Sequence, residues 1–149
     1  MRSTLLHLFF LAATTTALGI NCRGDKMCVK SKNIGLDPHN DLIDEFYQAL
    51  ANGASAVIKG GPIDPARIYN YGQDIACHQK SGICMYLEAT VTRGMVSVNG
   101  STIIARAGDL NSHGCWYCGS VPLSGDNKPE ELGILVVNWV SEFTCIGVC

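Results

Sequence analysis

Between residues 37 and 53, apolar residues recur with the period of an amphipathic helix. Four of them share one face of the predicted helix: Leu42, Ile43, Phe46 and Leu50. We expect Asp37 to cap this helix and Pro38 to occupy its first turn, because both residue types favour a helix start. Asn52-Gly53 should end it, since glycine readily adopts the left-handed conformation that follows many helices.

From Tyr69 onwards, the apolar residues change to the period of two that is typical of a strand. Every second residue of one segment is apolar and predicts a half-buried strand: Ile83, Met85, Leu87 and Ala89. Ile75-Ala76-Cys77 lies before it, and Lys80-Ser81-Gly82 has the composition of a turn. The two apolar segments therefore favour a β-hairpin.

A second helix is predicted to begin near Ser101 and to end at Gly114. Its apolar face consists of four residues: Ile103, Ile104, Ala107 and Leu110. The β-branched run from Gly133 to Val140 is typical of a central strand, whereas residues 18–36 predict an extended arm. Because helices and strands alternate only loosely, the expected fold is α+β, a two-layer α/β sandwich with an antiparallel sheet.

Residues 1–17 have the layout of a secretory signal peptide. Arg2 precedes the short apolar stretch from Leu5 to Ala13, and small residues follow as far as Ala17. A retained membrane anchor is the alternative, but the stretch is shorter than the roughly 20 residues that span a bilayer. We expect cleavage after Ala17, which would leave residues 18–149 as one extracellular domain.

All eight cysteines lie in the predicted mature chain: Cys22, Cys28, Cys77, Cys84, Cys115, Cys118, Cys145 and Cys149. An even number in a secreted chain indicates four disulfides, whose connectivity the spacing leaves open. The same chain has 10 basic and 13 acidic residues, for a net charge of −3. A nucleic-acid partner would require a basic face, so this class of partner is not expected.

Cys115-Trp116-Tyr117-Cys118 has the spacing of a thiol oxidoreductase motif. However, a helix is predicted to precede it, whereas the redox motif lies between a strand and a helix. Zinc binding by Cys115, Cys118, His113 and another cysteine is a second alternative. A second close cysteine pair is lacking, and oxidation during export would compete for the thiolates. Structural disulfides are therefore favoured, and no metal or cofactor is expected.

The residues also give little support to an enzyme. The mature histidines are His39, His78 and His113, and the chain has no Gly-x-Ser-x-Gly motif. We interpret His39 as a helix-surface residue, His78 as a turn residue and His113 as a helix-end residue. No catalytic residue is therefore assigned.

Asn99-Gly100-Ser101 is an acceptor sequence for N-linked glycosylation in a secreted protein. It lies where the second helix should begin, so Asn99 or Ser101 could instead cap that helix. Glycosylation and capping could each occur, in different copies of the protein.

Several short segments resemble those of the family of the fourth killer toxin of smut fungi, whose members are secreted proteins. They lie at both ends of the mature chain: residues 18–24, Cys28, 113–115, 118–120, 122–123 and 135–140. The resemblance implies that helices pack on one face of the antiparallel sheet. It also implies that Cys22 pairs with Cys115 and Cys28 with Cys118. Cys77 and Cys84 would then bridge the hairpin, and Cys145 and Cys149 are left to each other.

The resemblance further implies a protein that stops the growth of competing fungi by acting on calcium channels from outside the cell. The family toxin has a lysine two residues before the cysteine that matches Cys77, and Ile75 occupies that place here. Lys80 in the predicted turn is the nearest basic residue and becomes the candidate target contact. The expected partner is a membrane channel or another cell-surface protein, and the expected state is a monomer. The alternative is an effector or cell-surface binder that keeps the scaffold without blocking a channel.

Overall fold

The computed structural model describes residues 19–30, 41–90 and 97–149. Four helices form over these residues: α1 (Lys26–Lys30), α2 (Leu42–Asn52), α3 (Gly100–Ser112) and α4 (Pro129–Leu132). Seven strands accompany them: β1 (Ile68–Tyr69), β2 (Asp74–His78), β3 (Ile83–Glu88), β4 (Val98–Asn99), β5 (Gly119–Pro122), β6 (Ile134–Trp139) and β7 (Gly147–Val148). The predicted leader, residues 1–17, lies outside the described residues, as does His39.

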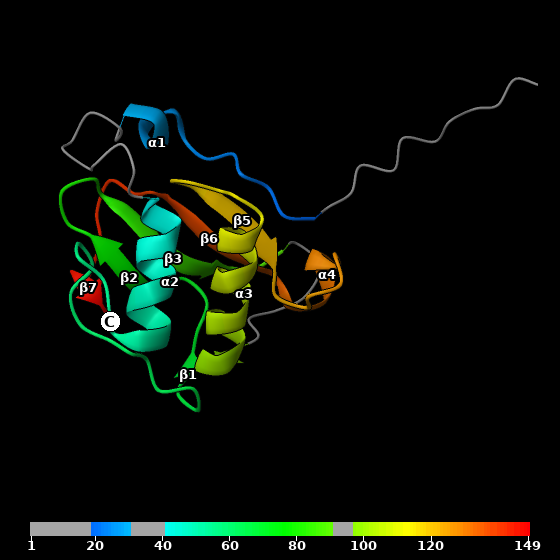
Figure 1. The fold of residues 1–149 in the computed structure, drawn as a ribbon. Coiled ribbons are helices and arrows are strands. Elements are labelled where there is room, and N and C mark those ends of the chain that lie inside the picture. The colour runs from blue at the N-terminus through cyan, green and yellow to red at the C-terminus, as the bar shows by residue number, and fades with distance from the viewer. Residues whose placement is uncertain (1–18, 31–40, 91–96) are drawn as a thin grey trace, which may run out of the picture.

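The main sheet is antiparallel and has the strand order β5-β6-β3-β2-β7. β6 pairs with β3 along its whole length, from Ile83 opposite Trp139 to Glu88 opposite Ile134. The run from Gly133 to Val140 therefore supplies an interior strand, as predicted. β1 and β4 form a separate two-stranded sheet at the far end of the molecule from α1 (Figure 1).

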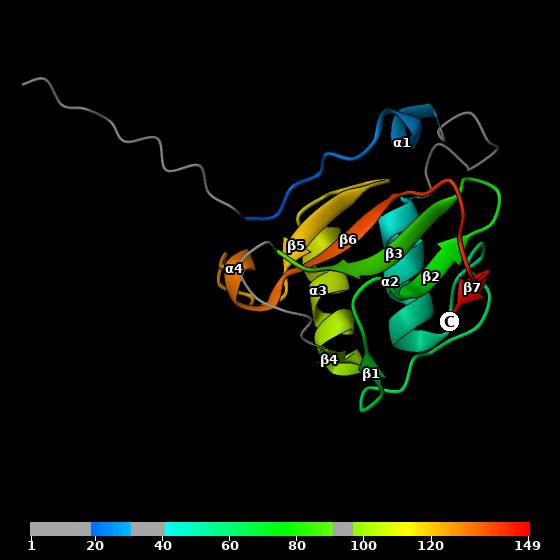
Figure 2. The same ribbon diagram turned by 180° about the vertical axis from the view of Figure 1, so that it is seen from behind.

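α2 and α3 cover one face of the main sheet, and the opposite view shows the strands lying over them (Figure 2). The core between the two layers is formed by alternate residues of β3 and β6, such as Met85 and Val137, and by the apolar helix faces. Phe46 of α2 and Ile103 of α3 are completely buried there. The predicted two-layer α+β sandwich is confirmed.

α2 begins four residues later than predicted. Its N-cap is Asp41 rather than Asp37, and the Asp41 Oδ1 accepts hydrogen bonds from Ile43 N at 2.9 Å and Asp44 N at 3.3 Å. Asp37 and Pro38 lie outside the described residues. The end of the helix is as predicted, because Gly53 follows it with a φ of 65°.

α3 lies close to α2 because Gly108 has no side chain: a Cβ there would be 3.2 Å from Cε2 of Tyr47. Asn111 Nδ2 also donates a hydrogen bond to Asp44 Oδ1 at 2.8 Å. α3 starts at Gly100, next to the predicted Ser101, and Asn99 is its N-cap. This pairing of the helices fixes the position of the segment that leaves α3, residues 113–118.

The predicted hairpin is confirmed as β2 and β3, with Cys77 opposite Cys84. β3 is more buried than a half-buried strand, however, since Cys84 on its outer face is also fully buried. We attribute this to the connection from β6 to β7, residues 140–146. It runs alongside the hairpin from the Gly82 carbonyl, which binds Val140 N, to Asp74, which binds Thr144 N (Figure 2). Sequence periodicity contains no information about this covering segment.

The N-terminal arm was predicted to be extended, but part of it is helical. Residues 26–30 form the short helix α1. Asp25 precedes this helix: the Asp25 Oδ1 accepts from Met27 N at 2.8 Å, and the Asp25 carbonyl accepts from Cys28 N at 2.9 Å. Before it, Asn21 and Ser120 exchange two backbone hydrogen bonds of 2.9 and 2.7 Å. The arm therefore runs along the edge strand β5 and places α1 beside β6.

Candidate functional site

Two disulfides attach the arm to the segment after α3. Cys22 is bonded to Cys115 and Cys28 to Cys118, across 93 and 90 residues of sequence. Gly24 lies directly over the second bridge, where a Cβ would be only 2.5 Å from Cβ of Cys118. Asn138 of β6 holds the same point, since its Oδ1 accepts from Asp25 N at 2.8 Å. α1 is thus fixed to the sheet by covalent and hydrogen bonds.

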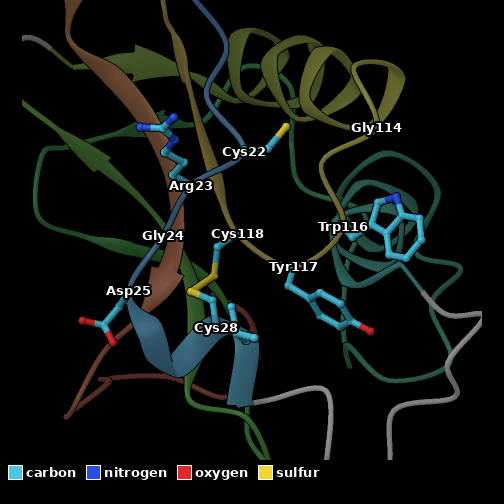
Figure 3. A pocket seen from close by; sticks show the side chains of 10 residues that line it. Cys22, Arg23, Gly24, Asp25, Cys28, Gly114, Trp116, Tyr117 and Cys118 are labelled. Carbon is cyan, nitrogen blue, oxygen red and sulfur yellow. A yellow bond between two sulfur atoms is a disulfide. The ribbon is translucent and has the colours of Figure 1, made fainter.

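A pocket of about 550 Å³ lies between the arm and residues 114–118. Figure 3 shows Trp116 and Tyr117 on one side of the Cys28–Cys118 bridge, with Arg23 and Asp25 on the other. Val29 and Trp116 line this pocket and are 64% and 61% exposed. Such large exposed side chains on a disulfide-fixed frame are typical of a contact surface for another molecule.

On the other side of α1 lies a second pocket, of about 290 Å³. Met27 and Lys30 of α1 line it together with Lys80 of the hairpin turn and Trp139 of β6. Lys80 is exposed, so the predicted target contact presents its ammonium to solvent. The structure places Lys30 on the same pocket, although residue spacing did not connect these two lysines.

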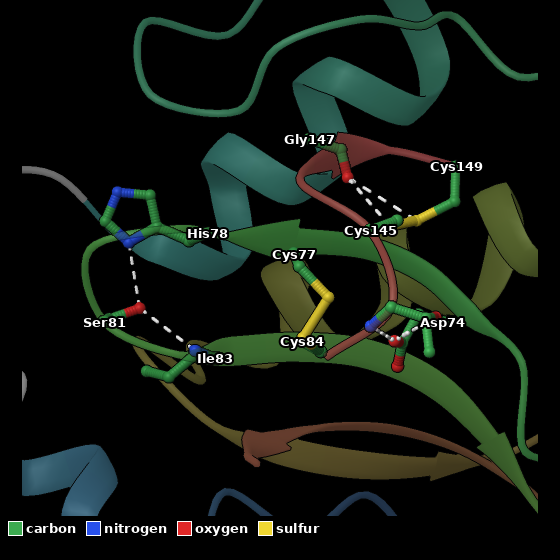
Figure 4. Close-up of a disulfide and its surroundings, with 10 residues drawn as sticks. Asp74, Cys77, His78, Ser81, Ile83, Cys84, Cys145, Gly147 and Cys149 are labelled. Carbon is green, nitrogen blue, oxygen red and sulfur yellow. Dashed lines mark hydrogen bonds between the residues drawn. A yellow bond between two sulfur atoms is a disulfide. The ribbon is translucent and has the colours of Figure 1, made fainter. Parts of the chain in front are cut away.

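The turn that carries Lys80 is held by buried polar contacts (Figure 4). Ser81 Oγ lies 2.8 Å from Nδ1 of His78 and accepts from Ile83 N at 3.2 Å. The turn closes with a hydrogen bond from Gly82 N to the His78 carbonyl at 3.1 Å, and Val140 N donates to the Gly82 carbonyl at 2.9 Å. The backbone at Lys80 is therefore well defined, although its side chain is exposed.

His78 is the last residue of β2 rather than a turn residue, and only 4% of its surface is exposed. Burial lowers the pKa of its imidazole below the ordinary value of 6.5. The nearby Lys80 charge lowers this pKa further, and the Glu45 carboxylate partly opposes the shift. The neutral imidazole is therefore the form that supports the turn.

Exposed cations gather around α1. Four exposed basic residues lie on α1 or beside it: Arg23, Lys26, Lys30 and Lys80. None of them forms a salt bridge within residues 19–30, 41–90 and 97–149. By contrast, Arg67, Arg106 and Lys128 each bind an oxygen elsewhere on the molecule. We call the four cations, together with Val29 and Trp116, the α1 surface.

The α1 surface is positively charged although the predicted mature chain carries a net charge of −3. Lys26 and Lys30 are one helical turn apart and so project on the same side of α1. Asp25 lies between these cations and Arg23, but its carboxylate already accepts from Met27 N. A local cluster of this kind attracts a negatively charged partner regardless of the overall charge.

Comparison with known proteins identifies the family. The sequence profile of the Kp4 family matches residues 5–141. The KP4 killer toxin of Ustilago maydis P4 virus is 30% identical over 125 residues, which amount to 84% of this chain and 82% of the toxin. The chain belongs to the Kp4 family. The resemblance that the terminal motifs indicated is thus confirmed, and membership supports a killer-toxin-like function.

The cysteines of this Kp4 chain leave no thiol for chemistry. All eight lie in the described residues and form four disulfides, in the expected pairs: the two of the arm, which the resemblance implied, and also Cys77–Cys84 and Cys145–Cys149. Cys115 and Cys118 are bonded to different partners, so the two cannot cycle as a local redox pair. They also offer no thiolate that could bind zinc with His113.

One further group of possible metal ligands occurs in the described part of the chain: Asp74, Cys77 and Cys84, whose ligand atoms lie within 4.8 Å of one another. Both sulfurs belong to a disulfide, so the group reduces to a single carboxylate. A metal centre built from several protein ligands needs more than one such donor.

The contact between His78 and Ser81 has the composition of a base and a nucleophile, but its surroundings are structural. Ser81 is only 4% exposed, and its oxygen already accepts from Ile83 N. No carboxylate hydrogen-bonds the ring in the regions that the structure describes, so the third member of a triad is absent there. His113, at the C-cap of α3, is exposed.

The sequence pointed to Lys80 alone, and it missed the α1 cations and Trp116. The available signal was the spacing of Lys26 and Lys30 in a segment that also contains Arg23. That signal required α1 to be recognised as a helix. In the described regions, none of the helices has the length and apolar composition needed to cross a membrane.

Proposed function

We propose that this chain is a secreted killer-toxin-like protein that inhibits the growth of competing fungi by blocking calcium channels from outside the cell. Its membership of the Kp4 family and its four disulfides support export and a toxin role. The observation that carries the proposal is the α1 surface, where exposed cations flank an aromatic groove on a rigid frame. In this proposal the protein acts by binding, as a monomer, and catalyses no reaction.

The charge of the α1 surface suits the mouth of a cation channel. Rings of carboxylates commonly select cations at such a mouth. A lysine ammonium is a compact point charge on a flexible stem, so it can compete with calcium for those carboxylates. Lys30 and Lys80 come from different elements but line one pocket, and two ammonium groups there would bind the ring more strongly than one. Trp116 would contact the protein surface beside the ring.

An effector or cell-surface binder without channel activity is the second candidate, and one observation favours it. The family toxin is expected to have a lysine two residues before the cysteine that matches Cys77. Ile75 occupies that position here and is completely buried in the core. This strand position cannot present a charge. Channel binding by this chain therefore depends on the α1 surface in place of that lysine.

Growth inhibition with a calcium test distinguishes the two candidates. Purified protein added to susceptible hyphae should slow their extension, and raised external calcium should relieve the effect because it restores flux through partly blocked channels. Magnesium chloride at the same concentration is the control, since it reproduces the ionic strength and the divalent charge. Relief by both salts would indicate screening of a charged contact rather than competition for calcium entry.

Binding to intact cells provides the second measurement. The labelled protein should bind susceptible cells and should be displaced by unlabelled KP4 killer toxin of Ustilago maydis P4 virus. Growth inhibition that calcium does not relieve, or binding that the toxin does not displace, would exclude the channel proposal. Binding without any growth inhibition would support the effector.

A further inference from the structure

Asn99 lies on the surface at the start of α3, at the opposite end of the molecule from α1 (Figure 1). Its side-chain Oδ1 accepts three hydrogen bonds: from Ser101 Oγ at 2.9 Å, Thr102 N at 3.0 Å and Thr102 Oγ1 at 2.8 Å. Its Nδ2 donates no hydrogen bond to any residue of the described ranges. The amide is thus divided between an oxygen that caps the helix and a nitrogen that faces solvent.

We propose that Asn99 carries an N-linked glycan and caps α3 in the same molecule. Asn99-Gly100-Ser101 is the single Asn-X-Ser/Thr triplet in the 149 residues. N-glycosylation uses the amide nitrogen and leaves the oxygen as an acceptor. The cap and the glycan therefore require different atoms of one side chain and do not compete.

The modification needs a lipid diphosphate-linked oligosaccharide and the transferase of the secretory pathway. Asn99 Nδ2 attacks the anomeric carbon of the first sugar, so that an N–C bond forms while the C–O bond to the diphosphate breaks. The lipid diphosphate leaves, and one amide proton is lost to a base of the transferase. Because this step occurs in the secretory pathway, the inference rests on the export that forms part of the proposed function.

The surroundings of Asn99 offer room for a sugar. Asn99 pairs with Ile68 across the β1–β4 ladder, so their side chains lie on the same side of it. Ile68 is 55% exposed, and the first sugar would cover this apolar side chain. The start of α3 is at the opposite end of the molecule from α1, so the glycan leaves the α1 surface open (Figures 1 and 2).

The test uses the mature chain secreted from yeast behind a foreign leader, so that failure of the chain's own leader cannot affect the outcome. We expect an intact mass above that of the polypeptide. Peptide-N-glycosidase F in heavy-oxygen water should then convert Asn99 to a labelled aspartate, which separates enzymatic release from spontaneous deamidation of Asn-Gly. Ser101→Thr should retain the glycan, whereas Ser101→Ala and Asn99→Asp should lose it. Secreted wild-type protein with the unmodified mass would refute glycosylation.

The shared role of Asn99 is tested by melting temperature. Wild-type protein made with tunicamycin has the same sequence without the glycan and should melt no higher than the glycosylated form. The Asn99→Ala variant made in the same way loses the cap and should melt several degrees lower. If the glycosylated protein melts as low as this variant, the glycan displaces the cap and the proposal of coexistence is wrong.

Discussion

Asp74 of β2 binds Thr144 through two hydrogen bonds: its Oδ2 accepts from Thr144 N and from Thr144 Oγ1, each at 2.8 Å (Figure 4). Thr144 lies in residues 140–146, which lead from β6 to β7. One carboxylate oxygen therefore holds the segment that covers the Cys77–Cys84 bridge. This contact connects residues 70 positions apart in the sequence.

Replacing Asp74 by alanine should release this segment. The variant loses two hydrogen bonds to a charged acceptor at a solvent-exposed site, which we expect to cost about 1–2 kcal/mol of the free energy of unfolding. Denaturant unfolding measures the change. Glu142→Ala is the matched control, because Glu142 is an exposed acid of the same segment without a described partner, and it should shift stability by less than about 0.5 kcal/mol. Equal effects of both changes would show that the Asp74 contact contributes nothing.

The disulfides of the arm should contribute more stability than that of the hairpin. Cys22–Cys115 spans 93 residues and Cys77–Cys84 spans 7. In the chain-entropy model these loops correspond to about 4–5 and about 2–3 kcal/mol, respectively. The double replacement Cys22→Ala/Cys115→Ala should therefore lower the melting temperature more than Cys77→Ser/Cys84→Ser. The reverse order would mean that burial of the hairpin bridge outweighs loop closure.

Much of the fold could be predicted because it depends on local pattern. The apolar face of α2 and the run that forms β6 are readable from residue spacing alone. The start of α2 is not, since Asp37 and Asp41 are both suitable caps. Ile43 N donates to the Trp116 carbonyl at 3.1 Å as well as to Asp41. A contact across the fold therefore accompanies the use of Asp41 as the N-cap. A long-range contact of this kind leaves no periodic signal.

The candidate site was only partly predictable for the same reason. Lys80 was identified from its place in a turn, which is a local property. Its proximity to Lys30 arises because two disulfides hold α1 against β6, and spacing left these pairings open. The charge cluster is thus a consequence of connectivity. The net charge of −3 is a sum over the predicted mature chain, so it does not reveal this local positive cluster.

The buried His78 should make stability depend on pH. Its pKa is lowered by burial, so the unfolded chain takes up a proton near pH 6.5 while the folded protein does not. The free energy of unfolding should therefore be highest above pH 6.5 and fall as the pH drops through the window below that value. Denaturation midpoints at about pH 7.5 and about pH 5.5 measure this slope. His78→Gln should be less stable at both pH values but should show a smaller difference between them; an unchanged difference would assign the slope to other groups.

Trp116 should contribute to binding without supporting the fold. Its side chain is 61% exposed, and its structural contact with Ile43 uses the backbone carbonyl, which substitution leaves in place. We therefore expect Trp116→Ser to reduce growth inhibition by roughly tenfold or more, as for an aromatic contact at the centre of an interface. The melting temperature should stay close to that of the wild type. Unchanged potency would remove the aromatic groove from the proposed contact.

Lys30 and Lys80 should act together. Each is exposed, each lines the same pocket, and neither forms a salt bridge with a described residue. Replacing either by glutamine removes one ammonium, and we expect a loss of potency of roughly three- to tenfold, with a loss above tenfold for the double variant. Stability should change by less than about 0.5 kcal/mol, because exposed lysines contribute little to folding.

Lys59→Gln is the matched control for this pair. Lys59 is also exposed and lacks a described salt bridge, but it lies beside β7, where its carbonyl accepts a hydrogen bond from Val148 N at 2.7 Å. The same change of net charge there should leave potency unaltered. Added salt should narrow the gap between wild type and the Lys30/Lys80 double variant, since screening weakens contacts between exposed charges. If Lys59→Gln reduces potency as much as Lys80→Gln, the effect comes from overall charge, and the α1 surface loses its place as the contact with the channel.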